Sequence, residues 1–487
     1  MKIVSSVALL LALTTPLVAA DQRVTVSVDC GETLDRQPVL WGHVNVSRRA
    51  PPPRELCAVI EREFGRPAVT RCWLMLDQMW DYRTDIYRFD YEINKDYYTD
   101  DPNKRRYGVA GHTTGLHYYD YVDAVAAHSD TVLMNIRRYE QEVLSGMITF
   151  EKWKEVFKSA VRHYKQRCPN LQYIEVLNEP TAANQSNLGN IKKYYAFYRR
   201  AYEAINELNS EFNFELPLQV GGCSGFRTDD AIHLINDFAR DTNPDKRLDF
   251  VSFHDYWVKN PVDISTWETE VDQALEKVQL PTDLPVFVTE IGYAWKSRAN
   301  PKRNLWHAAG MTAYQYQARH AQDLRLFPWV QYHSPPQIAM VQFDTQLRMT
   351  PYGASVKMLR MHRSTEVAAR SSGLDEHGNG VGALATMDDR GLALQLWNLD
   401  PRGGGTVDVR VSIANVPESL RSKRLIVRRY LIDTQHSNCF AASDAAGGLE
   451  MVGEQRMDAN ADLRLSASLE PMALCLWQIE AVNANSQ

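Results

Sequence analysis

The chain has 487 residues, a formal net charge of −6 and an aromatic content of 10%. So mild a charge gives no support to nucleic acid or an acidic membrane surface as the main partner. The length suits one large domain with a smaller one beside it.

The first twenty residues have the pattern of a signal peptide. Met1-Lys2 makes a short positive start, residues 4–13 form an apolar run broken only by two serines, and Leu17-Val18-Ala19-Ala20 precedes Asp21. The apolar run is too short to span a bilayer. This pattern predicts cleavage after Ala20 and export, so that the mature protein is secreted or periplasmic.

From residue 37 to 363, short apolar runs alternate with longer amphipathic stretches. The short runs have the length and the β-branched and aromatic content of buried strands, and they cover residues 39–45, 68–76, 131–136, 173–178, 218–222, 250–254, 286–290 and 329–333. The helix-like stretches cover roughly residues 53–64, 116–128, 150–168, 188–209, 229–240, 264–278, 304–326 and 351–363.

Eight strand–helix repeats in succession predict a (β/α)8 TIM barrel over residues 21–364 of an α/β protein. A doubly wound open sheet is the alternative, but it usually carries fewer units and a phosphate loop. Neither Gly-x-Gly-x-x-Gly nor a Walker-type loop follows the first apolar run.

After residue 365 the pattern changes to short alternating runs separated by Gly-, Asp- and Asn-containing turns. This texture predicts an antiparallel β-sandwich over residues 365–487. The segment Val24–Val28, within residues 21–36, is a candidate strand of the same sandwich. The seven cysteines share no metal-site spacing, and we expect most of them to be buried as small hydrophobic residues.

Two glutamates end apolar runs at places suited to catalysis. Glu179 follows the fourth run and precedes Pro180, and Glu290 ends the seventh run. Active sites of TIM barrels lie at the carboxyl ends of the strands. Glycosidic bonds break with the help of two carboxyl groups, one protonated and one ionised. The two glutamates therefore predict a glycosidase site.

In these two motifs the sequence resembles the clan A glycoside hydrolases, whose acid/base follows an Asn at the fourth strand and whose nucleophile ends the seventh. With its trailing sandwich it is most similar to family 39, the β-xylosidases and α-L-iduronidases. The resemblance implies a retaining enzyme with Glu179 as acid/base, Glu290 as nucleophile and no cofactor. It also implies that Asn178 binds the sugar 2-hydroxyl. The context Val176-Leu177 departs from the aromatic or Trp-Asn context common in the family.

Further polar and aromatic residues stand at run ends or in the adjoining loops. His254 or Tyr256, at the end of the sixth run, is expected to orient Glu290 and keep it ionised. The long loop of residues 77–114 is expected to shape the cleft. Other candidates for the substrate pocket are Trp41, His43, Arg137, Arg138, Trp295 and Trp329.

Two other functions are compatible with the same residues. The carboxylates could hold a divalent metal with His43 and His254 as further ligands, although metal barrels generally need three or more ligands at strand ends. The chain could also be a non-catalytic carbohydrate-binding protein. The sequence leaves open the sugar, its anomeric configuration and exo or endo action. Arg137 and Arg138 keep a uronic acid among the possible substrates. Xylose- or arabinose-containing plant glycans are an equal candidate.

Overall fold

A computed structural model describes residues 23–34, 41–46, 54–93, 116–182, 187–293, 300–329, 336–343, 347–418, 420–421, 423–442, 447–458 and 462–482. The expected signal peptide, Trp295, much of the 77–114 loop and most of the run 329–333 lie outside these residues. Among the described helices, none is both long and apolar enough to cross a lipid bilayer.

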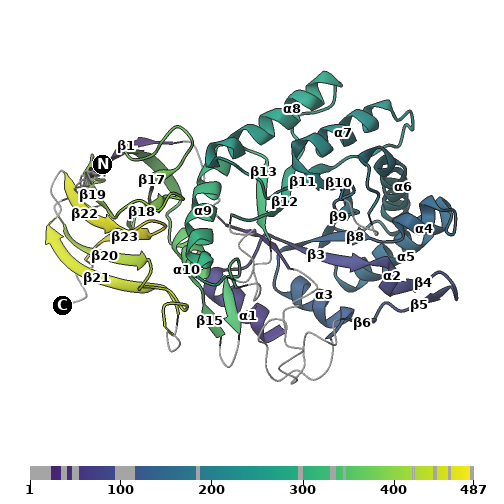
Figure 1. Ribbon diagram of the computed structural model, residues 1–487, viewed down its shortest axis with the longest axis horizontal. Helices are drawn as coiled ribbons and strands as arrows, with labels where there is room; N and C mark the ends of the chain where they lie inside the picture. The colour runs from purple at the N-terminus through teal and green to yellow at the C-terminus, as the bar shows by residue number, and fades with distance from the viewer. Residues whose placement is uncertain are drawn as a thin grey trace, which may run out of the picture.

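The larger unit is a parallel sheet of eight described strands that pair in chain order, and it appears at the right of Figure 1. The strands are β2 (His43–Asn45), β3 (Val69–Met75), β8 (Thr131–Arg137), β9 (Leu171–Val176), β10 (Gln219–Phe226), β11 (Phe250–Asp255), β12 (Val286–Ile291) and β13 (Leu324–Pro328). The first and last strands, β2 and β13, lie side by side, which nearly closes the sheet. The predicted TIM barrel is confirmed.

Amphipathic helices surround this sheet. They are α1 (Arg54–Phe64), α3 (Tyr118–Ala127), α5 (Phe150–Arg167), α6 (Tyr194–Phe212), α7 (Arg227–Arg240), α8 (Trp267–Lys277), α9 (Arg303–Ala318) and α10 (Pro351–Arg360). Short 3₁₀ turns precede α6 and α8 at Ile191–Lys193 and Pro261–Thr266. In α5, Thr149 caps the amino terminus by accepting a hydrogen bond from the Lys152 amide, while Trp153, Phe157 and Tyr164 pack inward.

The eighth strand lies earlier than the sequence predicts. The helix expected over residues 304–326 ends at Ala318. The eighth barrel strand, β13, is Leu324–Pro328, whereas the sequence predicts it at residues 329–333. Leu324, Leu326 and Phe327 are buried and Arg325 is partly exposed. Because Pro328 cannot donate a ladder hydrogen bond, it ends the strand, and Trp329 follows immediately.

Short elements decorate the loops at the carboxyl ends of the barrel strands. They are α2 (Leu76–Met79), β4 (Trp80–Asp81), β5 (Ile86–Tyr87), β6 (Glu92–Ile93), β7 (Leu116–His117), α4 (Glu140–Leu144), β14 (Val341–Phe343) and β15 (Leu347–Met349). The described part of the 77–114 loop therefore contains hairpin strands that the sequence patterns did not indicate.

The smaller unit is a second sheet, at the left of Figure 1, whose described strands run in the order β21-β20-β23-β18-β17-β16-β1-β19-β22. They are β1 (Arg23–Thr33), β16 (Thr365–Ser371), β17 (Gly380–Met387), β18 (Gly391–Leu399), β19 (Val407–Ala414), β20 (Arg424–Ile432), β21 (Glu450–Asp458), β22 (Leu463–Leu469) and β23 (Leu474–Ala481). Most pairs are antiparallel, but β1 runs parallel to β19. Alternate residues of β19 and β22 are buried, as expected of strands with one face on a core. Helix α9 packs against β18, which joins the two units.

Side chains fill the barrel interior in layers, as is usual for this fold. An aromatic layer of Tyr173, Phe250, Phe287 and Phe327 closes the amino-terminal end. A polar layer lies above it, at the carboxyl-terminal half of the strands. This polar layer supports the candidate site.

Candidate active site

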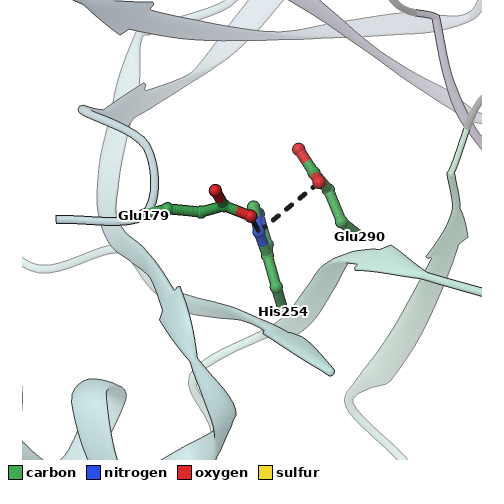
Figure 2. A group of neighbouring side chains, drawn as sticks. All are labelled: Glu179, His254 and Glu290. Carbon is green, nitrogen blue, oxygen red and sulfur yellow. Dashed lines mark hydrogen bonds and ion pairs between the residues drawn. The ribbon is translucent and has the colours of Figure 1, made fainter. Parts of the chain in front are cut away.

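Glu179 and Glu290 face each other at the carboxyl-terminal end of the barrel, with His254 beside both (Figure 2). One carboxylate oxygen of each glutamate and one ring nitrogen of His254 lie within 4.8 Å of one another. Glu290 is almost fully buried, whereas the side chain of Glu179 remains 25% exposed. The two carboxylates that the sequence singled out are therefore close neighbours.

Irregular backbone conformations orient the side chains of both glutamates. The pairing of β11 with β12 shifts between Phe253–Val288 and His254–Glu290, so that Thr289 is an extra residue. Such bulges redirect side chains next to active sites. After β9, Leu177 and Glu179 adopt the left-handed conformation, and the Glu179 amide donates to the Ser224 carbonyl at 2.9 Å. Positive φ in non-glycine residues is uncommon and concentrates at functional sites.

A fully buried arginine ties the site together. Arg71, on β3, donates through Nη1 to Glu290 Oε1 at 2.8 Å, through Nη2 to Asn178 Oδ1 at 2.8 Å and through Nε to Glu175 Oε2 at 2.7 Å. Burial lowers the pKa of Arg71, but the charges of Glu175 and Glu290 raise it above its usual value. The guanidinium therefore remains charged.

Glu175 supplies the second buried negative charge in this polar layer. Its carboxylate accepts hydrogen bonds from Arg71, from Asn135 Nδ2 at 2.8 Å and from Thr289 Oγ1 at 2.8 Å. Burial raises the pKa of Glu175, yet the charge of Arg71 is the main influence that brings it below its ordinary value. Arg71, Glu175 and Asn135 were not predicted as site residues from the sequence. Their signal was present, because Arg71 and Glu175 are charged residues inside otherwise apolar runs.

His254 and Tyr256 both contact the carboxylates, as expected. Tyr256 donates its hydroxyl hydrogen to Glu290 Oε2 at 2.7 Å. His254 Nδ1 lies 3.3 Å from Glu179 Oε1 and 3.5 Å from Glu290 Oε2. One ring nitrogen thus faces an oxygen of each glutamate.

Partial burial and the negative charge of a second carboxylate nearby would by themselves raise the pKa of Glu179. Burial does raise the pKa of Glu179, but the hydrogen bond and charge of His254 and the charges of two arginines bring it below its usual value. In this arrangement His254 and the two arginines together outweigh the effect of burial.

Arg137 ends β8 and contacts the loop of Glu179 through Asn187. Its Nη2 donates to Asn187 Oδ1 at 3.0 Å, and Asn187 Nδ2 donates to the Glu179 carbonyl at 2.7 Å. Burial, followed by the charge of Arg138, lowers the pKa of Arg137 to about 10. Arg138 forms an ion pair with Asp77, with 3.7 Å between Nε and Oδ2. Arg137 therefore supports the backbone on which Glu179 stands.

Trp329 lies at the mouth of the barrel. It directly follows β13, whereas the sequence predicts it to begin the eighth strand. Its ring centroid is 5.1 Å from that of Trp73, and Tyr256 packs against the same cluster. The guanidinium of Arg71 lies 5.6 Å from the Trp73 ring centre. The sequence analysis missed Trp73, which sits within an apolar run.

Two predicted pocket residues lie elsewhere. His43 pairs in register with Val69 at the start of β3, and its ring packs 5.1 Å from Phe327 of the aromatic layer. Burial lowers the pKa of His43 to about 3. Trp41 packs against Phe64, at the end of α1. Both stand before or at the beginning of β2, so they belong to the amino-terminal end of the barrel. Trp295 is outside the described residues.

Glu179, His254 and Glu290 are also the group of described side chains with a geometry compatible with a metal ion. His43 is not part of this group, so the ligand set considered from the sequence is not assembled. Arg71 and Tyr256 already donate to the two oxygens of Glu290. A guanidinium in that position opposes binding of a second cation.

Family comparison agrees with this geometry. The model of the glycosyl hydrolases family 39 matches residues 132–324, a segment that includes both glutamates. This chain is an O-glycosyl hydrolase most like family 39. No curated protein sequence matches it.

Solved structures share the fold of this hydrolase at low sequence identity. The family 39 enzyme from Xanthomonas axonopodis pv. citri has a TM-score of 0.68 at 13% identity, covering 94% of this chain and 97% of its own. A monomeric β-xylosidase from Caulobacter crescentus has a TM-score of 0.66 at 11% identity, with 94% and 100% covered. A glucosidase from Croceicoccus marinus has a TM-score of 0.64 at 15% identity, with 95% and 100% covered.

Removing the Arg71 charge should destabilise the hydrolase. Arg71→Met leaves two buried carboxylates without their shared partner, and such losses typically cost about 3–5 kcal/mol. Adding Glu175→Gln should recover part of that loss, because one of the uncompensated charges disappears. Urea unfolding of the two single variants and the double variant measures this coupling. Strictly additive losses would show that the pair is not coupled.

Replacing His254 should change the pH dependence of the hydrolase. In His254→Phe the hydrogen bond and charge that lower the pKa of Glu179 are lost, while burial, which raises it, remains. The pKa of Glu179 should rise, so a proton needed for catalysis is kept to higher pH. The basic limb of kcat/KM should therefore move upward. Tyr256→Phe is the control, because Tyr256 bonds Glu290, and its basic limb should stay in place.

Proposed function

We propose that this glycoside hydrolase cleaves oligo- or polysaccharides by double displacement with retention of anomeric configuration. The main support for this mechanism is the distance between Glu179 and Glu290, whose facing carboxylate oxygens lie within 4.8 Å of each other. Retaining enzymes hold their carboxyl groups about 5–5.5 Å apart, whereas inverting enzymes leave about 6.5–9.5 Å for a water. The short spacing supports the retaining mechanism.

In the first step the Glu290 carboxylate attacks the anomeric carbon, and the bond to the leaving oxygen breaks. Glu179 gives its proton to that oxygen. In the second step water attacks the same carbon, Glu179 takes a proton from the water, and Glu290 leaves as carboxylate. Arg71 donates to one oxygen of Glu290 and Tyr256 to the other, so the two bonds fix the orientation of the proposed nucleophile.

The lowered pKa of Glu179 imposes a condition on the first step. Glu179 must be protonated when the glycosidic bond breaks, so we propose that substrate binding raises its pKa. A bound sugar displaces water from the 25% exposed side chain, and desolvation disfavours the charged carboxylate.

Asn178 is the proposed partner of the sugar 2-hydroxyl. Arg71 holds its oxygen, Oδ1, at 2.8 Å. This bond fixes the orientation of the side-chain amide and leaves the nitrogen to donate to a substrate oxygen. A hydrogen bond to the 2-hydroxyl strengthens in an oxocarbenium-like transition state.

The substrate and the site of action are further parts of the proposal. The structural likeness to a β-xylosidase and a glucosidase makes xylosides and glucosides the first substrates to screen, together with uronides. Export through the signal peptide expected at residues 1–20 suits a polysaccharide outside the cytoplasm. Activity that survives chelation would exclude the metal-dependent alternative. Hydrolysis of any aryl xyloside, glucoside or uronide in this screen would exclude a purely carbohydrate-binding role.

The nucleophile is tested by Glu290→Ala. Without the carboxylate no glycosyl-enzyme forms, so hydrolysis of every substrate should be abolished. Azide should restore turnover of activated aryl glycosides and give a glycosyl azide of inverted configuration, identified by nuclear magnetic resonance. Glu175→Ala is the matched control, because Glu175 is a buried glutamate of the same layer that lies behind Arg71. Azide should not rescue it. Substantial hydrolysis by Glu290→Ala without azide would contradict the assignment.

The acid is tested by Glu179→Ala with leaving groups of different basicity. Substrates with poor leaving groups need the proton and should slow by about 10²–10⁴-fold, the usual contribution of general acid catalysis. Activated aryl glycosides should slow far less in the glycosylation step. Pre-steady-state measurements of that step provide the comparison. An equal slowing of both substrate types would remove Glu179 from the acid role.

A further inference from the structure

A cavity of about 460 Å³ lies next to the candidate active site. Tyr256 forms part of its wall and at the same time donates its hydroxyl to Glu290. Other parts of the wall come from α9 and from two sandwich segments, at Asn379 before β17 and Pro401 after β18. The cavity therefore adjoins the catalytic carboxylates at the junction of barrel and sandwich.

Aromatic rings dominate this wall. Besides Tyr256, the rings belong to Trp257, Tyr293, Trp306 and Tyr314. Trp257 is 39% exposed, which is unusual for a large aromatic side chain. The position of Tyr293 depends on Gly310 of α9, because a Cβ at that residue would come within 2.1 Å of the Tyr293 ring. Flat apolar rings with polar edges are suited to stacking against the apolar face of a sugar.

The charged residues of the wall are both cationic. Lys259 and Arg303 line the cavity, and the described residues of the wall include no aspartate or glutamate. The Arg303 guanidinium lies 3.7 Å from the ring centre of Trp306, which holds it over an aromatic face. Within the described residues, no carboxylate forms an ion pair with Lys259 or Arg303. Their donors are available to an anionic ligand.

We infer that this cavity binds a sugar unit of the substrate that carries a carboxylate or sulfate group, beside the unit whose bond is cleaved. The inference rests on the proposed function. Stacking on the rings positions the sugar, and Arg303 and Lys259 bind its anionic group. A guanidinium offers paired donors that match both carboxylate and sulfate geometry.

Binding to the full chain with Glu290→Gln tests this without turnover. The probes are glucuronate, glucose 6-sulfate and glucose, measured by isothermal titration calorimetry. At least one anionic probe should bind about tenfold more tightly than glucose, since hydrogen bonds to charged groups contribute more than neutral ones. A preference for glucuronate alone identifies a uronic acid, and a preference for glucose 6-sulfate alone identifies a sulfated sugar.

Three further substitutions locate the anion-binding group. Arg303→Met should remove most of the preference for the anion, whereas Lys302→Met, the neighbouring exposed cation outside the cavity wall, should preserve it. Arg137→Met tests whether the anion is bound beside Glu179 instead. Thermal unfolding of each variant verifies folding.

Equal affinity for the three probes, no measurable binding, or loss of the preference in Arg137→Met but not in Arg303→Met would each overturn the inference. The binding assay does not depend on catalysis. It therefore gives a result even if the Glu290→Ala experiment contradicts the proposed function.

Discussion

The site depends on one buried guanidinium. Arg71 reaches Glu290, Asn178 and Glu175 at once, from a side chain with no exposure to solvent. A charge in such a place is stable only when it is paired and fully hydrogen-bonded. Glu175 provides the second partner, so Arg71 can bind Glu290 without being neutralised by it alone. The two glutamates of the candidate site are thus supported by a buried ion-pair network, and the aromatic layer lies on its amino-terminal side.

The network requires side chains from four strands to point into a narrow interior, and regular strands alone do not supply this. The extra residue Thr289 lets neighbouring residues of β12 serve two partners, with Thr289 bonding Glu175 and Glu290 bonding Arg71. Left-handed Leu177 and Glu179 turn the chain after β9 in a similar way. Such conformations cost free energy. Here packing and the bonds of Asn187 and Ser224 to the same loop offset that cost.

The barrel could be predicted because its physical signal is local. Buried strands and amphipathic helices each leave a pattern within a few residues, and the order of eight such units implies a closed sheet. The two glutamates of the candidate site were found for the same reason, since each stands at the end of an apolar run. His43 and Trp41 were misassigned because β2 begins only at His43. An apolar run does not reveal at which of its residues the strand begins. The eighth strand was misplaced because the helix-like pattern of apolar residues continues past Ala318, where α9 ends, into the residues that form β13.

Arg71 and Glu175 were visible as charges in buried runs, but their pairing was not. They sit on β3 and β9, strands separated by β8 in the sheet, so their contact follows from the curvature of the barrel rather than from sequence spacing. The same limit applies to His254. Its place between two carboxylates brings the pKa of Glu179 below its usual value, whereas the two glutamates considered alone suggested the opposite shift. The direction of a pKa shift in a cluster is set by the whole set of neighbours, so it requires the three-dimensional arrangement. At this site His254 and the two arginines therefore decide the direction of the Glu179 pKa shift as much as its burial does.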